Sequence, residues 1–306
     1  MDKFQKILVT GFNKSGLDKD SWDQIKKFTR GLIFEPAADV DCLFSRFNRI
    51  DKKIIDSFPK LKYIGLLATG TGTVDLEYAK KKKVTVCNVP GYATESVAEW
   101  VFALILEHLH DLEKAKQVAH KGDFSGDGFT TSEILGKKFG IIGLGRIGFR
   151  VAQIAQGFGA QVTYWSRHRK DKAEKTGLKY ESIDNLIRTS DFISLHTLTT
   201  KETENILDEK KINSLKAGAI IINVSGMEQV NIQALMKRLS KGDITFIFDH
   251  PDEMKKENVK KLAKFSNCLI YPPIGFVSAE ARINKQAIFV SNLENFLKGK
   301  PTNKVN

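Results

Sequence analysis

The chain has 306 residues, of which 42% are hydrophobic and 27% are charged. A domain typically holds about 100–200 residues, so this length favours two domains and is ample to bury a core. The composition is that of an ordinary globular protein and excludes disorder, collagen and coiled coil as descriptions of the whole chain. The most apolar stretch, 97–109, is broken by Glu99, Glu107 and His108. It falls short of the roughly 20 apolar residues that a membrane span needs.

Basic residues outnumber acidic ones by 48 to 36, which gives a formal net charge of +12. The lysines are scattered, and no helix-turn-helix, RRM or zinc-finger pattern accompanies them. A solvated basic surface is therefore favoured over a nucleic-acid partner, a third hypothesis that the net charge alone motivates. The three cysteines form no CxxC pair, and His108, His110 and His120 lack the spacing of metal ligands, so neither disulfides nor a metal is expected. With no targeting segment visible, these features predict a reducing, cytoplasmic location.

Short β-branched segments alternate with segments of helical period along almost the whole chain. Strands separated by helices of about 10–15 residues are typical of βαβ units and a parallel sheet. The sequence therefore predicts an α/β fold with doubly wound parallel sheets. Examples of the expected strands, in chain order, are 6–10, 63–67, 84–87, 139–143, 161–165, 192–196, 219–224, 244–248 and 268–271.

The strongest local motif is a glycine loop, Gly143-Leu-Gly145-Arg-Ile-Gly148. An apolar strand runs into it, a helical pattern follows it, and a second strand comes next, which is the context of a dinucleotide-binding fingerprint. Gly143 permits the tight turn, Gly145 lets the backbone approach a pyrophosphate, and Gly148 lets helix and strand pack closely. The free amides at the helix N-terminus would bind the phosphates.

The end of the second strand selects between the two nicotinamide cofactors. Sites for NAD place an Asp or Glu there to bind the ribose 2′-hydroxyl. This chain has Ser166-Arg167-His168-Arg169-Lys170 instead, with no carboxylate to repel a 2′-phosphate and with cations that suit one. The segment predicts NADP, with NAD also possible. A basic surface loop that contacts no ligand is the alternative.

Further motifs, in order along essentially the whole chain, match one family. They are 59–70, 74–76, 88–99, 190–196, 221–225 and 299–306. With the glycine loop, these segments resemble the D-isomer-specific 2-hydroxyacid dehydrogenase family, in its glycerate dehydrogenase/hydroxypyruvate reductase-like branch. The resemblance implies two Rossmann-like lobes, with a cofactor domain of residues 100–276 inserted into a smaller substrate lobe of residues 1–99 and 277–306.

The resemblance also implies which residues surround the ligands. Backbone amides near Thr69 and Gly70 would face the carboxylate of a small 2-keto or 2-hydroxy acid, and Tyr92 would line the same pocket. Contacts of a homodimer would fall around 97–127. Together with the glycine loop, the expected cofactor-binding residues are Gly143, Gly145, Arg146, Ile147, Gly148, Ser166, Arg167, His168, His196, Thr197, Val224 and Asp249.

Three positions depart from the family pattern. The family uses an arginine to bind the substrate carboxylate, a histidine to transfer the proton, and a glutamate to orient that histidine. In the matching segments this chain has Gly226, Pro273 and Met254, respectively. Glycine has no side chain to bind a carboxylate, proline has no proton to give, and a positioned general acid contributes about 10²–10⁴-fold. The resemblance therefore implies a cofactor-binding pseudoenzyme in which 2-keto acid reduction is very weak or absent.

An active enzyme with relocated catalytic groups is the alternative hypothesis. Such a protein would be an NADP-dependent oxidoreductase similar to hydroxypyruvate or glyoxylate reductases. A screen over 2-keto acids would separate the two hypotheses. The candidate acids are Tyr92, His196, Glu228, His250 and Asp252.

Overall fold

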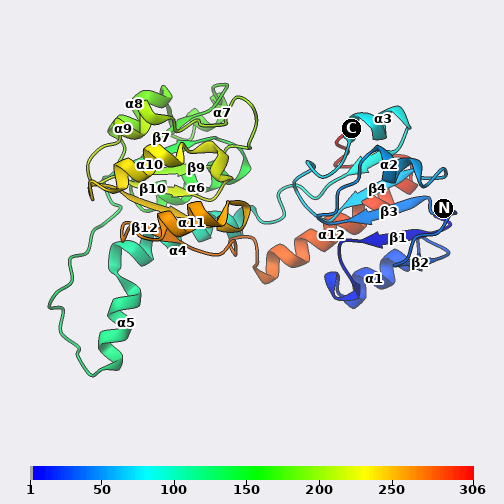
Figure 1. The fold of residues 1–306 in the computed structure, drawn as a ribbon, viewed down its shortest axis with the longest axis horizontal. Helices are drawn as coiled ribbons and strands as arrows, with labels where there is room; N and C mark the ends of the chain where they lie inside the picture. The colour runs from blue at the N-terminus through cyan, green and yellow to red at the C-terminus, as the bar shows by residue number, and fades with distance from the viewer. Residues whose placement is uncertain (1–2) are drawn as a thin grey trace. The chain divides into compact units, whose positions relative to one another are not determined.

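A computed structural model describes residues 3–306 and divides the chain into two compact units. The first unit contains the chain up to Ala93 together with Ser278–Asn306, and the second unit is Thr94–Val277 (Figure 1). The expected first boundary, between 99 and 100, falls inside a helix, α4 (Thr94–His110), that belongs as a whole to the second unit. In the part of the chain that the structure describes, no helix is long and apolar enough to cross a membrane.

The first unit has a parallel sheet of five strands in the order β2-β1-β3-β4-β5. This is one of the two common doubly wound orders. The strands are β1 (Ile7–Thr10), β2 (Leu32–Ile33), β3 (Cys42–Ser45), β4 (Tyr63–Leu66) and β5 (Thr85–Cys87); the helices are α1 (Lys19–Lys26), α2 (Lys52–Asp56), α3 (Leu76–Lys81) and α12 (Ala279–Leu297), with a 3₁₀ turn at Lys14–Gly16.

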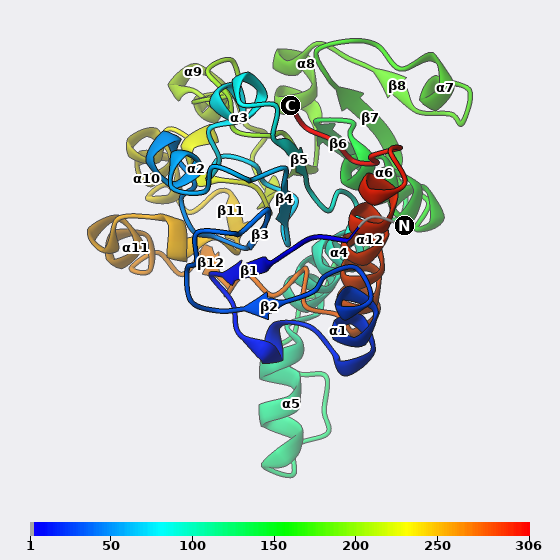
Figure 2. The same ribbon diagram turned by 90° about the vertical axis from the view of Figure 1, so that its right-hand side faces the viewer.

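Helix α12 returns from the far end of the sequence to cover one face of this sheet, where it packs beside α1 (Figure 2). The ring centroids of Phe289 on α12 and Phe44 on β3 lie 4.6 Å apart. Leu43, the neighbour of Phe44, packs in the core on the opposite face with residues such as Ile55. This alternation follows from the two-residue period of a strand and explains why both faces of the sheet are apolar.

The second unit has a parallel sheet of seven strands in the order β12-β11-β10-β9-β6-β7-β8. The chain runs outward from β6 in one direction and then reverses, so the carboxyl ends of β6 and β9 form a topological switch point, where such sheets bind ligands. The predicted α/β fold with two doubly wound parallel sheets is confirmed. The strands are β6 (Lys138–Ile142), β7 (Gln161–Trp165), β8 (Lys179–Tyr180), β9 (Phe192–Leu195), β10 (Ile220–Asn223), β11 (Thr245–Phe248) and β12 (Cys268–Ile270).

Seven further helices accompany α4 in this unit. Helix α5 buries none of its side chains, and Figure 1 shows it and the segment after it extending away from the sheet of the second unit. The helices are α5 (Leu112–His120), α6 (Arg146–Gly157), α7 (Asp171–Glu174), α8 (Ile183–Thr189), α9 (Glu209–Asn213), α10 (Ile232–Leu239) and α11 (Lys256–Leu262), with 3₁₀ turns at Met227–Gln229 and Pro251–Glu253.

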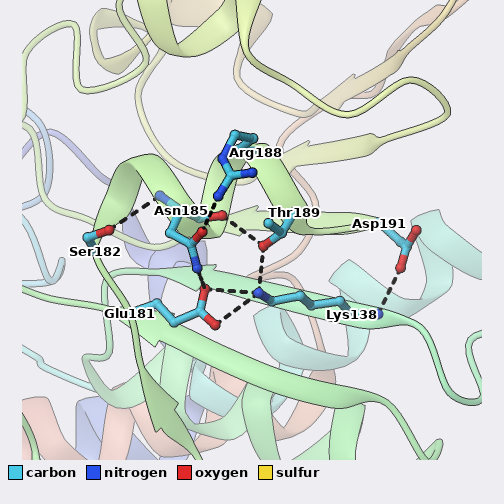
Figure 3. A network of polar contacts seen from close by, with 7 residues as sticks. All are labelled: Lys138, Glu181, Ser182, Asn185, Arg188, Thr189 and Asp191. Carbon is cyan, nitrogen blue, oxygen red and sulfur yellow. Dashed lines mark hydrogen bonds and ion pairs between the residues drawn. The ribbon is translucent and has the colours of Figure 1, made fainter.

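A polar network fastens the amino end of β6 to α8 (Figure 3). The ammonium group of Lys138 lies 2.9 Å from each carboxylate oxygen of Glu181 and 2.5 Å from the hydroxyl of Thr189. The backbone N–H of Lys138 donates to Asp191 at 2.9 Å. Both members of the ion pair are only about one-fifth exposed, so solvent screens it less than a surface pair. The network lies at the amino end of the central strand, opposite the edge that carries the glycine loop.

Candidate functional site

Two of the three loop glycines are required by close backbone contacts. Gly143 has a φ of +99°, and a Cβ there would lie 2.8 Å from the backbone carbonyl carbon and oxygen of His196 at the end of β9. A Cβ on Gly148 would lie 2.1 Å from the carbonyl oxygen of Gly143. Real Cβ atoms do not approach that closely, so α6 and β6 can pack at this distance only with glycine at 148.

Gly145 has no such packing constraint. It is the N-cap of α6, its φ is −83°, and no side chain caps the helix there. Within residues 3–306, no atom lies within 4 Å of the position that a Cβ would take. The open space lies against the N-terminus of a helix of twelve residues, whose first amides have no partner within the helix. This arrangement fits the pyrophosphate of a dinucleotide.

A hollow of about 550 Å³ opens beside the glycine loop. It lies at the carboxyl ends of β6, β7 and β9, at the switch point of the sheet. Seven of the twelve residues expected to bind cofactor line it: Gly143, Gly145, Ser166, Arg167, His168, His196 and Thr197.

The cations at the end of β7 differ in their availability to a ligand. Arg169 is held by two hydrogen bonds to the carboxylate of Glu174, at 3.0 and 2.6 Å, and it does not line the hollow. Arg167 lines the hollow and forms an ion pair with Glu202, which also lines it. The sequence at the end of β7 gives no sign of Glu202, because the loop after β9 approaches β7 only in the folded chain.

His196 directly follows β9 and lines the same hollow. Its Nε2 lies 2.7 Å from the hydroxyl of Ser194, and burial lowers the pKa of its imidazole to about 3. The ring is therefore neutral at neutral pH. The adjacent Thr197 is fixed by Gln229, a fully buried residue whose amide accepts from the Thr197 hydroxyl at 2.6 Å and donates to its carbonyl at 2.7 Å.

The other five expected cofactor residues do not line this hollow. Arg146 is exposed, Ile147 packs against the core in the first turn of α6, and Gly148 is buried under it. Val224 and Asp249 directly follow β10 and β11, so they lie at the same carboxyl edge of the sheet.

The carboxylate of Asp249 is buried, and only one of its two oxygens accepts a hydrogen bond from a residue that the structure describes. It is 3% exposed, and its Oδ2 accepts a hydrogen bond of 2.9 Å from the indole N–H of Trp100. Its Oδ1 is buried and has no hydrogen-bond partner among the described residues, although Nε2 of His250 lies 3.6 Å away. Burial raises the pKa of Asp249, which the charge of His250 opposes.

The three residues expected to depart from the family pattern, Gly226, Met254 and Pro273, have no side chain able to bind an acid or to transfer a proton. A Cβ on Gly226 would lie 2.4 Å from Oε2 of Glu228 and 2.8 Å from the hydroxyl of Thr199. Met254 is half-buried, packs against the core, and lines a separate hollow of about 390 Å³ together with Glu228. Pro273 is half-buried in the segment after β12.

The three residues expected to contact substrate belong to the first unit. Thr69 and Gly70 are exposed in the loop after β4, and the Thr69 hydroxyl donates to the carbonyl of Val89 at 2.9 Å. Tyr92 is half-buried, with its ring against the ammonium group of Lys285.

Comparison with known proteins identifies the family. The family model described as "D-isomer specific 2-hydroxyacid dehydrogenase, NAD binding domain" matches residues 102–275. The glyoxylate reductase of Thermococcus litoralis is 35% identical over 295 residues, covering 93% of this chain and 89% of that protein. The hydroxypyruvate reductase of Blautia hydrogenotrophica is 34% identical over 283 residues, covering 90% of this chain and 87% of that protein.

A solved structure of an acyclic imino acid reductase (Bsp5), in complex with NADPH and D-Arg, covers 99% of this chain and 100% of its own. Its TM-score is 0.86 and its sequence identity is 27%. Sequence and fold therefore agree over nearly the whole chain. The chain belongs to the D-isomer-specific 2-hydroxyacid dehydrogenase family of NAD(P)-dependent oxidoreductases, in the branch that contains the glyoxylate and hydroxypyruvate reductases.

Proposed function

We propose that this protein binds NADP(H) in the hollow beside the glycine loop, and that it reduces 2-keto acids very weakly or not at all. The observation that carries the proposal is the contrast between two parts of the second unit. The space around Gly145 is open and lies between Gly143 and Gly148, whereas we infer from the sequence motifs that Gly226, Met254 and Pro273 occupy the three family catalytic positions. A bound nicotinamide ring would supply or accept a hydride. The chain lacks the family's groups that would hold the acid and move the proton.

The preference for NADP rests on the charges of the hollow. Arg167, His168 and Lys170 line it, and guanidinium groups suit bidentate contact with a phosphate. The related imino acid reductase structure contains NADPH. A 2′-phosphate would have to compete with Glu202 for Arg167, so we propose a preference for NADP and not an exclusion of NAD.

The direct test combines binding with turnover. NADPH and NADH are titrated into the purified protein by fluorescence, and NADPH oxidation is then followed with hydroxypyruvate and with glyoxylate. Saturable NADPH binding without turnover supports the proposal. Turnover at the rates typical of dehydrogenases, on the order of 1–10³ per second, contradicts it. Absence of binding to either nucleotide contradicts the cofactor assignment itself.

The second candidate function is an active oxidoreductase, which the pair of Asp249 and His250 favours. Oδ1 of Asp249 is buried and lies 3.6 Å from Nε2 of His250, just beyond hydrogen-bond distance. A closer approach would let this carboxylate orient the histidine as a proton donor. Imines belong in the substrate screen as well, because a protonated imine needs no proton donor when it accepts a hydride. Adding ammonium or methylamine to the 2-keto acid assay tests this, and His250→Asn tests the histidine.

We also propose that the protein is a homodimer. Helix α5 has no buried side chain within its own chain, and Leu112 and Phe124 are 50% and 86% exposed. A partner subunit would remove this apolar surface from water. Light scattering coupled to size exclusion measures the mass directly. The cytoplasm remains our expectation for the compartment.

A further inference from the structure

The indole of Trp100 and the carboxylate of Asp249 form a hydrogen-bonded pair at the carboxyl edge of the sheet in the second unit. Trp100 lies in α4, and Asp249 directly follows β11. The indole N–H donates to Oδ2 of Asp249 at 2.9 Å. Asp249 is buried, and its Oδ1 has no hydrogen-bond partner among residues 3–306. Trp100 therefore fixes one oxygen of this carboxylate and leaves the other able to accept a hydrogen bond from a ligand.

Neighbouring residues hold the indole of Trp100 in place. Its ring meets the ring of Tyr271 edge to face, with the centroids 5.9 Å apart, and the Tyr271 hydroxyl donates to Glu107 at 2.8 Å. A Cβ on Gly275 would lie 2.6 Å from Cδ1 of the indole, so a larger residue at 275 would displace the ring. The hydroxyl of Ser96, also on α4, donates to the carbonyl of Gly275 at 2.5 Å. These contacts keep the indole where its N–H reaches the carboxylate.

The indole also favours the charged form of Asp249. Burial raises the pKa of Asp249, whereas the charge of His250 and the hydrogen bond from Trp100 lower it. Hydrogen bonds to a carboxylate stabilise its charged form. Nε2 of His250 lies 3.6 Å from Oδ1, which is beyond hydrogen-bond distance. In the described part of the chain, Trp100 is therefore the one side chain that donates to this carboxylate.

The place of Asp249 in the sheet indicates the ligand. A sheet with this strand order consists of two mononucleotide-binding halves. One half contains β6, β7 and the glycine loop, and β9, β10 and β11 belong to the other. If the pyrophosphate of NADP(H) lies at Gly145, as proposed above, the nicotinamide end extends over the carboxyl ends of β9 to β11. Nicotinamide carries a primary amide, whose N–H groups suit the free oxygen of a buried carboxylate.

We propose that Trp100 is a positioning residue for the cofactor. Its indole N–H holds Oδ2 of Asp249 and thereby presents Oδ1 to the amide of the nicotinamide ring. A contact of Asp249 with the cofactor is what the family resemblance implies, and the role of Trp100 rests on the proposed binding of NADP(H).

The test compares two ligands that share one end. NADPH carries the nicotinamide, whereas adenosine 2′,5′-bisphosphate carries the adenosine and its 2′-phosphate but no nicotinamide. Both ligands are titrated by calorimetry into the full-length wild type, Trp100→Phe, Asp249→Asn and the double variant. Trp100→Phe retains an aromatic ring and removes the N–H donor.

Two further variants separate positioning from stability. Trp22→Phe is the matched control, because the indole N–H of Trp22 donates to the carbonyl of Lys14 at 2.7 Å within the first unit. Gly275→Ala leaves Trp100 and Asp249 unchanged but places its methyl carbon 2.6 Å from the indole, so the ring must move. Thermal melts report the stability of every variant.

The expected result is a loss confined to the ligand that carries nicotinamide. Trp100→Phe should bind NADPH about three- to tenfold more weakly than the wild type, the worth of one hydrogen bond, and bind the bisphosphate as the wild type does. Asp249→Asn and Gly275→Ala should also weaken only NADPH. The double variant should bind NADPH about as weakly as Asp249→Asn alone, because the indole acts through the carboxylate. Trp22→Phe should leave both affinities unchanged, whatever its Tm.

Three outcomes would overturn the role of Trp100: NADPH binding by Trp100→Phe equal to that of the wild type, an equal loss for both ligands, or effects of the two substitutions that multiply in the double variant. If Trp100→Phe does not fold, Gly275→Ala decides, and an equal loss for both ligands or no loss for NADPH refutes the role. Failure of the proposed cofactor function is distinct, because the wild type then binds neither ligand and the role of Trp100 falls with it. If the wild type binds both and Trp100→Phe loses neither, NADP(H) binding stands and the positioning role alone is wrong.

Discussion

Replacing a loop glycine with alanine should have opposite effects at Gly145 and at Gly148: one change should weaken NADPH binding, and the other should lower stability. Gly145→Ala places a methyl group in open space at a φ of −83°, a conformation that alanine adopts without strain. Stability should change by less than about 1 kcal/mol, which is about 2–4 °C in Tm for a domain of this size. The methyl group occupies the space through which a pyrophosphate would approach, so NADPH should bind about tenfold more weakly or worse.

Gly148→Ala should instead lower the stability of the fold. Its methyl carbon would lie 2.1 Å from the Gly143 carbonyl oxygen, so α6 must move away from β6. Overpacking of this kind costs about 1–3 kcal/mol, and Tm should fall by about 2–4 °C for each kcal/mol.

The assay is differential scanning fluorimetry with and without NADPH, together with a fluorescence titration of NADPH. If folded Gly145→Ala binds NADPH as the wild type does, the loop does not contact the phosphates. If Gly148→Ala melts at the wild-type temperature, the close packing of helix and strand is wrong.

Three other variants, one of them a triple substitution, test separate parts of the second unit. Glu202→Gln should tighten NADPH binding by about two- to fivefold, the value of an exposed ion pair, and leave NADH binding unchanged; equal effects on both nucleotides would show that the carboxylate does not face the 2′-phosphate. Gly226→Arg, Met254→Glu and Pro273→His together should raise hydroxypyruvate reduction by about 10²-fold, and no gain would mean that the pocket differs at more than these positions. His196 has a pKa of about 3 in the fold against an ordinary 6.5, so the unfolded chain binds more protons between these values. Stability should therefore fall as pH drops below about 6.5, by at most about 1.4 kcal/mol per pH unit. Urea unfolding at pH 7, 6 and 5 measures this slope, and His196→Gln should flatten it.

The glycine loop was predictable because its function depends on local geometry. The strand, the turn and the helix that surround Gly143 and Gly148 are adjacent in sequence, and each has its own pattern of apolar residues. The period-two and helical patterns likewise predicted most strands of both sheets. Three strands were not among the expected examples: β2 and β8, which have two residues each, and β3, which has four. A strand of two residues is too short to display an alternating pattern.

The contacts made between distant segments could not be predicted from local patterns. The pairing of Arg167 with Glu202 joins the end of β7 to a loop that comes after β9. The contact of Lys285 with the ring of Tyr92 joins α12 to the segment after β5, almost two hundred residues earlier in the chain. In both cases the sequence shows the side chains, but only the fold shows which of them meet.

The return of α12 to the first unit has a consequence for how the protein forms during synthesis. Phe289, Val290 and Leu293 belong to the core of that unit, and the side-chain amide of Asn292 donates to the carbonyl of Asn88 at 2.8 Å. These contacts span about two-thirds of the sequence, so they form only after α12 has been synthesised. The segment from Thr94 to Val277 is continuous and can fold while translation is still under way. The strands of the first unit therefore lack part of their core until α12 has been made, after the whole of the second unit.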